Sequence, residues 1–202
     1  MLTVAIGLVS ALVYGTADFF GGLAARRIGA VLATAVAAAT GLLVVLALLP
    51  FVGGTWSTEA VLLGALSGLT GAVAVGLLYA CLAIGPMSIL SPLTAVVSAI
   101  VPMAVGLARG EAVGMLGGVA LVIALVAVVL VGFVPERGAV RPSLRGVLMA
   151  IGSGLAIGAF LVIMDAAPDD SGLVPLLANR VVNPTVMFAV VLVLVIAARR
   201  RG

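Results

Sequence analysis

The chain consists of long apolar runs separated by short breaks that hold glycine, proline or charged residues. The runs lack the apolar–polar alternation of strands, and each is near the roughly 20 residues that cross a bilayer as a helix. Strands cross a membrane only in closed barrels, so continuous runs favour helices. The pattern predicts an all-α integral membrane protein with seven transmembrane helices, at about 3–24, 29–52, 60–83, 88–107, 112–134, 146–166 and 173–198.

The breaks contain the residue types that end and begin helices. Gly85-Pro86 separates the third and fourth runs, since proline has no amide hydrogen with which to continue a helix. Ser57 or Thr58 is suited to cap the third helix. The longest break, 135–145, contains two prolines and three arginines and is expected to be a linker.

Composition indicates that lipid surrounds most of the molecule. The chain is 64% hydrophobic and 8% charged, whereas soluble domains are about half apolar and a quarter charged. This sequence has too few polar residues to cover a core in water. We therefore expect the lipid bilayer to be its main partner. The chain is expected to cross the plasma membrane (the cell inner membrane) several times.

The charged and reactive residues exclude several classes of chemistry. The sequence has no histidine and no lysine, so imidazole metal ligands, histidine proton relays and a retinal Schiff base are excluded. Cys81 is the only cysteine, so an internal disulfide cannot form. We expect no cofactor, no metal, no catalytic residue and no nucleic-acid partner. The net charge of +3 comes from arginines at the ends of the runs, and their bias places 135–145 and Arg199–Arg201 in the cytoplasm.

Two of the runs share a stripe of small residues at every fourth position. Such a stripe lets another helix approach closely. The two stripes are 143 residues apart, and Ser10 and Ser153 are separated by the same number of residues. This shared spacing points to a duplication. Chance in a sequence rich in alanine and glycine is the alternative. The stripes are Gly7, Ala11 and Gly15 in the first run, and Ala150, Gly154 and Gly158 in the sixth.

If the repeat is real, its unit contains five helices. Because five is odd, the second copy enters the membrane in the opposite orientation, which is the inverted-repeat plan of many secondary transporters. The predicted organisation is a first five-helix repeat at 3–134, a linker at 135–145, and an incomplete second repeat of two helices at 146–198. The chain then corresponds to seven helices of a ten-helix protein.

Four stretches resemble the EamA-type members of the drug/metabolite transporter superfamily: 11–27, 77–95, 110–131 and 145–180. Gly85-Pro86 followed by Pro92 is the most telling feature. The resemblance covers nearly the whole chain and implies ten helices in two five-helix repeats that transport small metabolites, amino acids or drugs. Helices eight to ten have no counterpart here, so the chain looks C-terminally truncated. A homodimer mate or another partner would then supply the missing helices.

Ionisable residues inside the predicted helices are the first candidates for function, because a charge in hydrocarbon is costly. Asp18 is suited to bind a proton or a cationic group of a substrate. The alternative is an interfacial acid paired with Arg26 or Arg27. Tyr14 and Tyr79 place hydroxyl groups within helices, where tyrosines line cavities or pack between helices.

Arg180 lies about two turns into the seventh predicted helix, beside Asn179 and Asn183. A guanidinium there is suited to hold a carboxylate or phosphate through two hydrogen bonds. The alternative is that the side chain extends to the nearer membrane interface. Asp165, near the end of the sixth helix, is a candidate partner for Arg180 or a marker of the membrane boundary.

Three prolines, Pro92, Pro102 and Pro184, are expected to interrupt helices and free backbone carbonyls. Broken helices near the bilayer midplane often mark transporter sites, although tolerated kinks are the commoner case. Pro92 therefore joins the candidate residues for substrate binding or coupling.

The sequence favours a secondary transporter of small molecules that works by alternating access, with proton coupling as one option. The first alternative is a non-transporting membrane scaffold or the remnant of a transporter. A membrane-embedded enzyme ranks last, because the helices offer scattered single acids rather than a nucleophile with a base.

Overall fold

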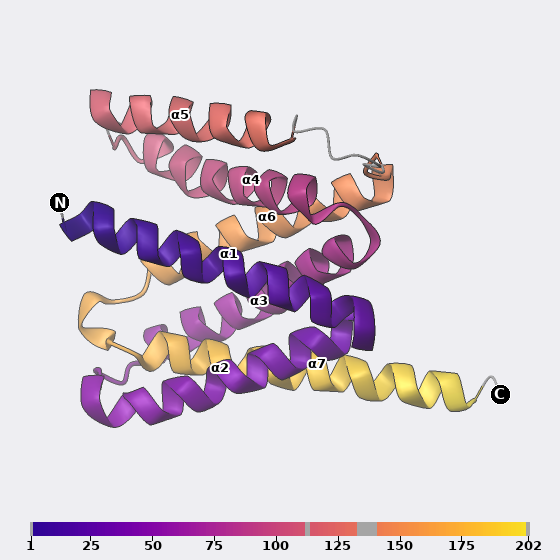
Figure 1. The fold of residues 1–202 in the computed structure, drawn as a ribbon. Helices are drawn as coiled ribbons and strands as arrows, with labels where there is room; N and C mark the ends of the chain where they lie inside the picture. Colours follow the sequence, from indigo (N-terminus) through magenta and orange to yellow (C-terminus); the bar gives the residue numbers. More distant parts are fainter. Residues whose placement is uncertain (1, 112–113, 133–140, 201–202) are drawn as a thin grey trace.

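The computed structural model describes residues 2–111, 114–132 and 141–200, which form seven α-helices and one short 3-10 helix (Figure 1). The all-α prediction is confirmed, and the helices begin and end within a few residues of the predicted bounds. Residues 112–113 and 133–134 of the predicted fifth helix, and most of the predicted linker, lie outside the described residues. The elements are α1 (Leu2–Ile28), α2 (Ala30–Val52), α3 (Thr58–Ile84), α4 (Met87–Ala108), α5 (Met115–Gly132), α6 (Leu144–Asp165), η1 (Asp169–Ser171) and α7 (Val174–Arg199).

Six of these helices are long and apolar enough to cross a bilayer, namely α1, α2, α3, α4, α6 and α7. Large apolar side chains remain exposed along them, for example Leu12, Leu62 and Val193. An apolar surface that continues along six helices exceeds what soluble proteins expose and suits a lipid environment. The chain is therefore built as a multi-pass membrane protein.

Local sequence sets the helix ends. Ser57 precedes α3 and caps it: its side chain accepts a hydrogen bond from the amide of Ala60 at 3.0 Å, so of the two predicted caps, Ser57 and Thr58, the first is used. Helix α1 continues past its predicted end and includes Arg26 and Arg27 in its last turn, where basic side chains offset the negative end of the helix dipole. It ends before Gly29, whose φ of 84° is readily adopted by glycine alone.

Prolines lie inside three helices without ending them. Helix α4 runs through Pro92 and Pro102, and α7 runs through Pro184. The expectation that these prolines interrupt helices is wrong. In a membrane bundle, neighbouring helices and small adjustments of the backbone compensate for the one hydrogen bond that proline removes.

The last two helices pack among the first five (Figure 1). Helix α6 lies between α3 and α4, and α7 lies against α2 and α3. Helix α1 crosses α2 and α3, while α5 lies beside α4 at one edge. The segments predicted as separate repeats are thus interlocked around α3 and α6, and the inverted symmetry between them stays a prediction.

The turns lie at two opposite ends of the bundle. One end, called here the Gly85 end, has the turns at Gly29 and at Gly85. The other, the Trp56 end, has two turns that bind each other: the amide of Thr55 donates to the carbonyl of Asp170, and the amide of Leu173 donates to the carbonyl of Gly53, both at 3.0 Å. These bonds tie the loop between α2 and α3 to the start of α7.

Candidate functional site

Asp18 lies on the half of α1 nearer the Gly85 end and is partly buried. The hydroxyl of Ser91 on α4 donates a hydrogen bond to Oδ2 of Asp18 at 3.1 Å. Ser91 directly precedes Pro92, which places this proline beside the site but gives it no direct role there. The carboxylate of Asp18 is therefore held within a membrane-spanning helix by a neutral hydroxyl.

Arg26, the nearest basic residue along α1, makes other contacts. Its guanidinium donates to the carbonyl of Leu82 at 3.2 Å and to the carbonyl of Gly85 at 2.9 Å. Carbonyls at the end of a helix lack donors from within it, so Arg26 satisfies the C-terminal end of α3. Among the described residues the salt bridge is that of Arg109 with Asp165, so the alternative in which Asp18 pairs with Arg26 or Arg27 is not seen.

Tyr79 packs α3 against α1 close to Asp18. Its side chain is almost fully buried, and its ring lies directly against Gly21, one turn after Asp18. A side chain at Gly21 would occupy the space of the ring. Tyr79 therefore fixes the contact between α1 and α3 one turn from Asp18. We call Asp18, Ser91 and Tyr79 the Asp18 site.

A second group of polar side chains lies between α3 and α7. Nδ2 of Asn179 donates to Oγ of Ser67 at 3.0 Å, and Oγ of Ser67 lies 2.7 Å from the carbonyl of Gly64, to which it donates. Asn183, one turn further along α7, is 3% exposed, and its Oδ1 is buried without a hydrogen-bond partner among the described residues. Both asparagine amides lie over Gly71 of α3.

Arg180 extends from α7 toward α2, where its guanidinium lies against Gly41. Asn183 adjoins both Asn179 and Arg180 on α7, since residues three and four apart in a helix are neighbours; the asparagine amides face α3 and the guanidinium faces α2. We call these three residues the Arg180 site. The structure thus brings the three polar candidates of the seventh helix together, and it separates them from Asp18.

Asp165 belongs to neither site. It forms a salt bridge with Arg109, with Nη1 and Oδ2 3.6 Å apart and both side chains largely exposed. The predicted pairing of Asp165 with Arg180 is wrong. Helices α4 and α6 pack together and both end at the Trp56 end, which brings Arg109 rather than Arg180 to this acid. Asp165 is the last residue of α6, and its role as a marker of the membrane boundary stays a prediction.

Tyr14 is also outside both sites. Its side chain is 73% exposed, so the described helices do not enclose it. Neither a cavity nor a helix–helix contact of Tyr14 is formed by the described helices, and its role as a cavity-lining residue stays a prediction. The prediction for Tyr14 was based on a hydroxyl group within an apolar helix, and this does not reveal on which face of the helix the residue lies.

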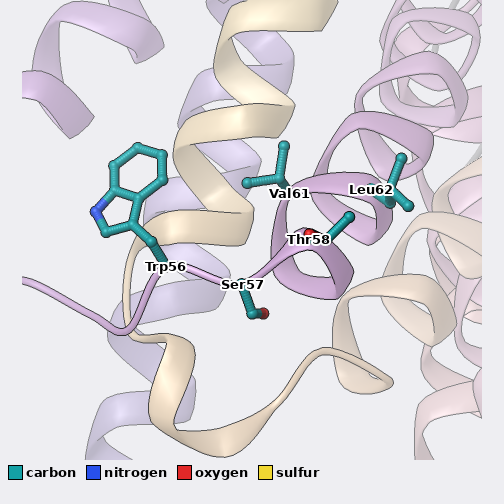
Figure 2. A pocket seen from close by; sticks show the side chains of 5 residues that line it. All are labelled: Trp56, Ser57, Thr58, Val61 and Leu62. Atoms are coloured by element: carbon teal, nitrogen blue, oxygen red, sulfur yellow. The ribbon is translucent and has the colours of Figure 1, made fainter.

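A shallow hollow at the Trp56 end is lined by the loop and first turns of α3 (Figure 2). Its residues are Trp56, Ser57, Thr58, Val61 and Leu62. Figure 2 shows the indole of Trp56 projecting away from α3, where a half-polar ring suits a membrane–water interface. This hollow contains none of the candidate residues. Gly71, which faces the asparagines of the Arg180 site, lies about two and a half turns beyond Leu62 along α3.

Sequence reasoning missed the neutral residues that complete both sites. Ser91 and Ser67 bind the candidate side chains, and Gly41 and Gly71 leave space for them. Ser67 lies in a run of small residues, and nothing in its own position distinguishes it from them. Comparison of the chain with protein-family models, with curated proteins and with solved structures gives no match.

Proposed function

We propose that this chain forms part of an EamA-type secondary transporter that moves small metabolites or drugs across the plasma membrane by alternating access. The observation that carries the proposal is the carboxylate of Asp18, which lies within a membrane-spanning helix and receives its hydrogen bond from Ser91. A charged side chain at depth in a bilayer costs several kcal/mol, about 2.5–3.5 on insertion scales. Residues of this kind usually bind an ion, a proton or a substrate.

The position of Asp18 suits a coupling role. Its carboxylate accepts from α4, whereas its own helix, α1, packs mainly on α2 and α3. A proton or cationic group that binds Asp18 competes with Ser91 for the carboxylate oxygens and changes the contact between α1 and α4. Coupling of this kind would let an ion gradient bias the position of α1, as alternating access requires.

A non-transporting membrane scaffold is the second candidate function. The half of α1 nearer the Trp56 end favours it, because residues 5–17 are exposed on every face within the described structure. A transporter encloses its substrate between helices, and no described helix packs against this part of α1. In the scaffold function, the same surface would bind another membrane protein.

The two functions are separated by proton flux in reconstituted vesicles. The full chain would be placed in liposomes containing a pH-sensitive dye and challenged with a panel of amino acids, organic acids and organic cations. We expect at least one panel member to change the internal pH in the wild type, and Asp18→Asn to abolish that change because it cannot release a proton.

The matched control is Glu59→Gln, which removes an exposed acid from the first turn of α3. It should leave flux unchanged. Equal flux in Asp18→Asn and wild type would remove the coupling role, and a properly inserted wild type that responds to no panel member would favour the scaffold.

A further inference from the structure

The guanidinium of Arg180 lies against the middle of α2 along the length of that helix. Gly41, which it contacts, is the central residue of the 23-residue helix α2, eleven residues from either end. At 1.5 Å per residue, Gly41 is about 16 Å from both ends of the helix. The hydrocarbon core is about 30 Å thick, so the charge lies near the midplane and does not extend to an interface.

Gly41 makes this position available. A β-carbon added to Gly41 would lie 3.2 Å from Nη1 of Arg180 and 3.3 Å from Cζ. Any larger side chain would push the guanidinium away. Among the described residues, the only salt bridge joins Arg109 to Asp165, so no acid of the described chain neutralises Arg180.

A second polar group on α7 lacks a partner. Oδ1 of Asn183 is buried and accepts no hydrogen bond from the described residues. An unsatisfied buried acceptor costs about 1–3 kcal/mol. A cation and an unpartnered acceptor are therefore three residues apart on α7, at midplane depth.

Toward the Gly85 end, the junction of α2, α3 and α7 is filled by apolar side chains. Ala35, Ala72 and Met187 pack there and are almost fully buried. Met187 is one turn beyond Asn183, so this cluster separates the Arg180 site from the Gly85 end. Toward the Trp56 end, the paired turns at Thr55 and Leu173 join the same helices.

We propose that Arg180 and Asn183 bind a small organic carboxylate that also carries a hydroxyl or ammonium donor next to its charge. Arg180 donates two hydrogen bonds to the carboxylate, which its planar guanidinium suits. Oδ1 of Asn183 accepts from the neighbouring donor. The site itself follows from the contacts above, and only the identification of its ligand as a transported substrate rests on the proposed function.

The test uses the purified full chain in neutral detergent and follows thermal unfolding through Cys81. This residue is the only cysteine and is fully buried, so a thiol-reactive dye labels it on unfolding. The probes are lactate and propionate, which differ by the hydroxyl donor. We expect lactate to raise the melting temperature, since a ligand that binds only the folded state stabilises it, and propionate to bind more weakly.

Three variants separate the parts of the site. Arg180→Gln should weaken lactate binding at least about tenfold, which is the loss expected for a charge-assisted hydrogen bond. Asn183→Ala should remove the preference for lactate over propionate. Gly41→Leu keeps the charge but fills the space of the guanidinium, and it should weaken both anions. Arg180→Lys keeps the charge without the planar fork and should bind lactate more weakly than the wild type but more tightly than a chain without the charge. It takes the place of Arg180→Gln should that variant fail to fold.

Controls and contrary outcomes complete the test. Arg109→Gln removes the exposed arginine of the salt bridge, and Gly15→Leu adds the same side chain as Gly41→Leu at an open position; neither should alter lactate binding. Failure of lactate to stabilise the wild type, or equal stabilisation of Arg180→Gln, would overturn the proposal. Stabilisation by phosphatidylglycerol but not by lactate would identify a lipid headgroup as the ligand and overturn it as well. Lactate binding without any vesicle flux would retain the site and reject the transporter function.

Discussion

The two stripes of small residues have the same spacing and opposite surroundings. In α6, a β-carbon added to Gly154 would lie 2.8 Å from the carbonyl oxygen of Thr94, and one added to Gly158 would meet the side chain of Val101. These contacts are the close approach of α6 to α4. In α1, a β-carbon added to Gly7 or Gly15 would meet no atom within 4 Å.

The difference shows that a stripe of small residues permits another helix to approach closely but does not determine whether a helix packs there. Helix α1 does pack closely elsewhere, through Gly21 and Gly22 against Tyr79 and Leu82. Those glycines are outside its stripe. The stripe of α1 is therefore not the part of this helix that holds it in the described structure, whereas the stripe of α6 anchors that helix in the core.

The largest expected effect comes from filling one stripe and then the other. Gly158→Leu places a branched side chain against Val101 in the contact between α6 and α4, and should lower the free energy of unfolding by about 3 kcal/mol, the upper range for overpacking a core. Gly15→Leu, at the matching position 143 residues earlier, should leave it nearly unchanged. The measurement is thermal unfolding in detergent, followed by dye labelling of Cys81.

The control is Gly118→Leu in α5, another glycine with open space around it. If Gly15→Leu destabilises the protein as much as Gly158→Leu does, another helix covers the α1 stripe in solution. The contrast drawn from the described helices would then fail.

The matched serines test the same contrast with a smaller change. Ser153 is buried in α6, and its hydroxyl donates to the carbonyl of Ala74 on α3 at 2.8 Å. Ser153→Ala should cost about 1 kcal/mol, as usual for a hydrogen bond between helices in a membrane protein. Ser10→Ala removes the counterpart in α1, which is exposed, and should cost almost nothing. A cost for Ser10→Ala equal to that for Ser153→Ala would show that Ser10 also bonds to another helix.

Much of the fold follows from the length and order of the apolar runs. A run of about 20 apolar residues forms a helix in lipid because its backbone must satisfy its own hydrogen bonds. The cap at Ser57 follows from side-chain chemistry in the same local way. Even the extension of α1 through Arg26 is a local matter, because basic residues are favourable at the end of a helix.

The contacts between helices were harder to predict, because a uniformly apolar helix does not reveal which face it buries. Tyr14 and Tyr79 illustrate this: both are tyrosines within apolar helices, and one is exposed while the other is buried against Gly21. The predicted pairing of Asp165 with Arg180 was wrong for the same reason, because the partner of Asp165 depends on which helix packs against α6. The Arg180 site was partly predictable because Asn179, Arg180 and Asn183 are close in the sequence itself.

The smallest expected effect concerns the other half of α1, where two adjacent arginines differ in their contacts. Arg26 donates to the last carbonyls of α3, whereas Arg27 makes no side-chain hydrogen bond to the described residues. Arg26→Gln should therefore lower the free energy of unfolding by about 0.5 kcal/mol, because these bonds are partly exposed to water. Arg27→Gln removes the same charge from the same helix end and should have a smaller effect. Equal melting temperatures for the two variants would mean that charge at the end of α1, and not the contact with α3, is what these arginines contribute. Attachment of this half of α1 would then rest on the packing of Gly21 and Gly22 and on the hydrogen bond between Asp18 and Ser91.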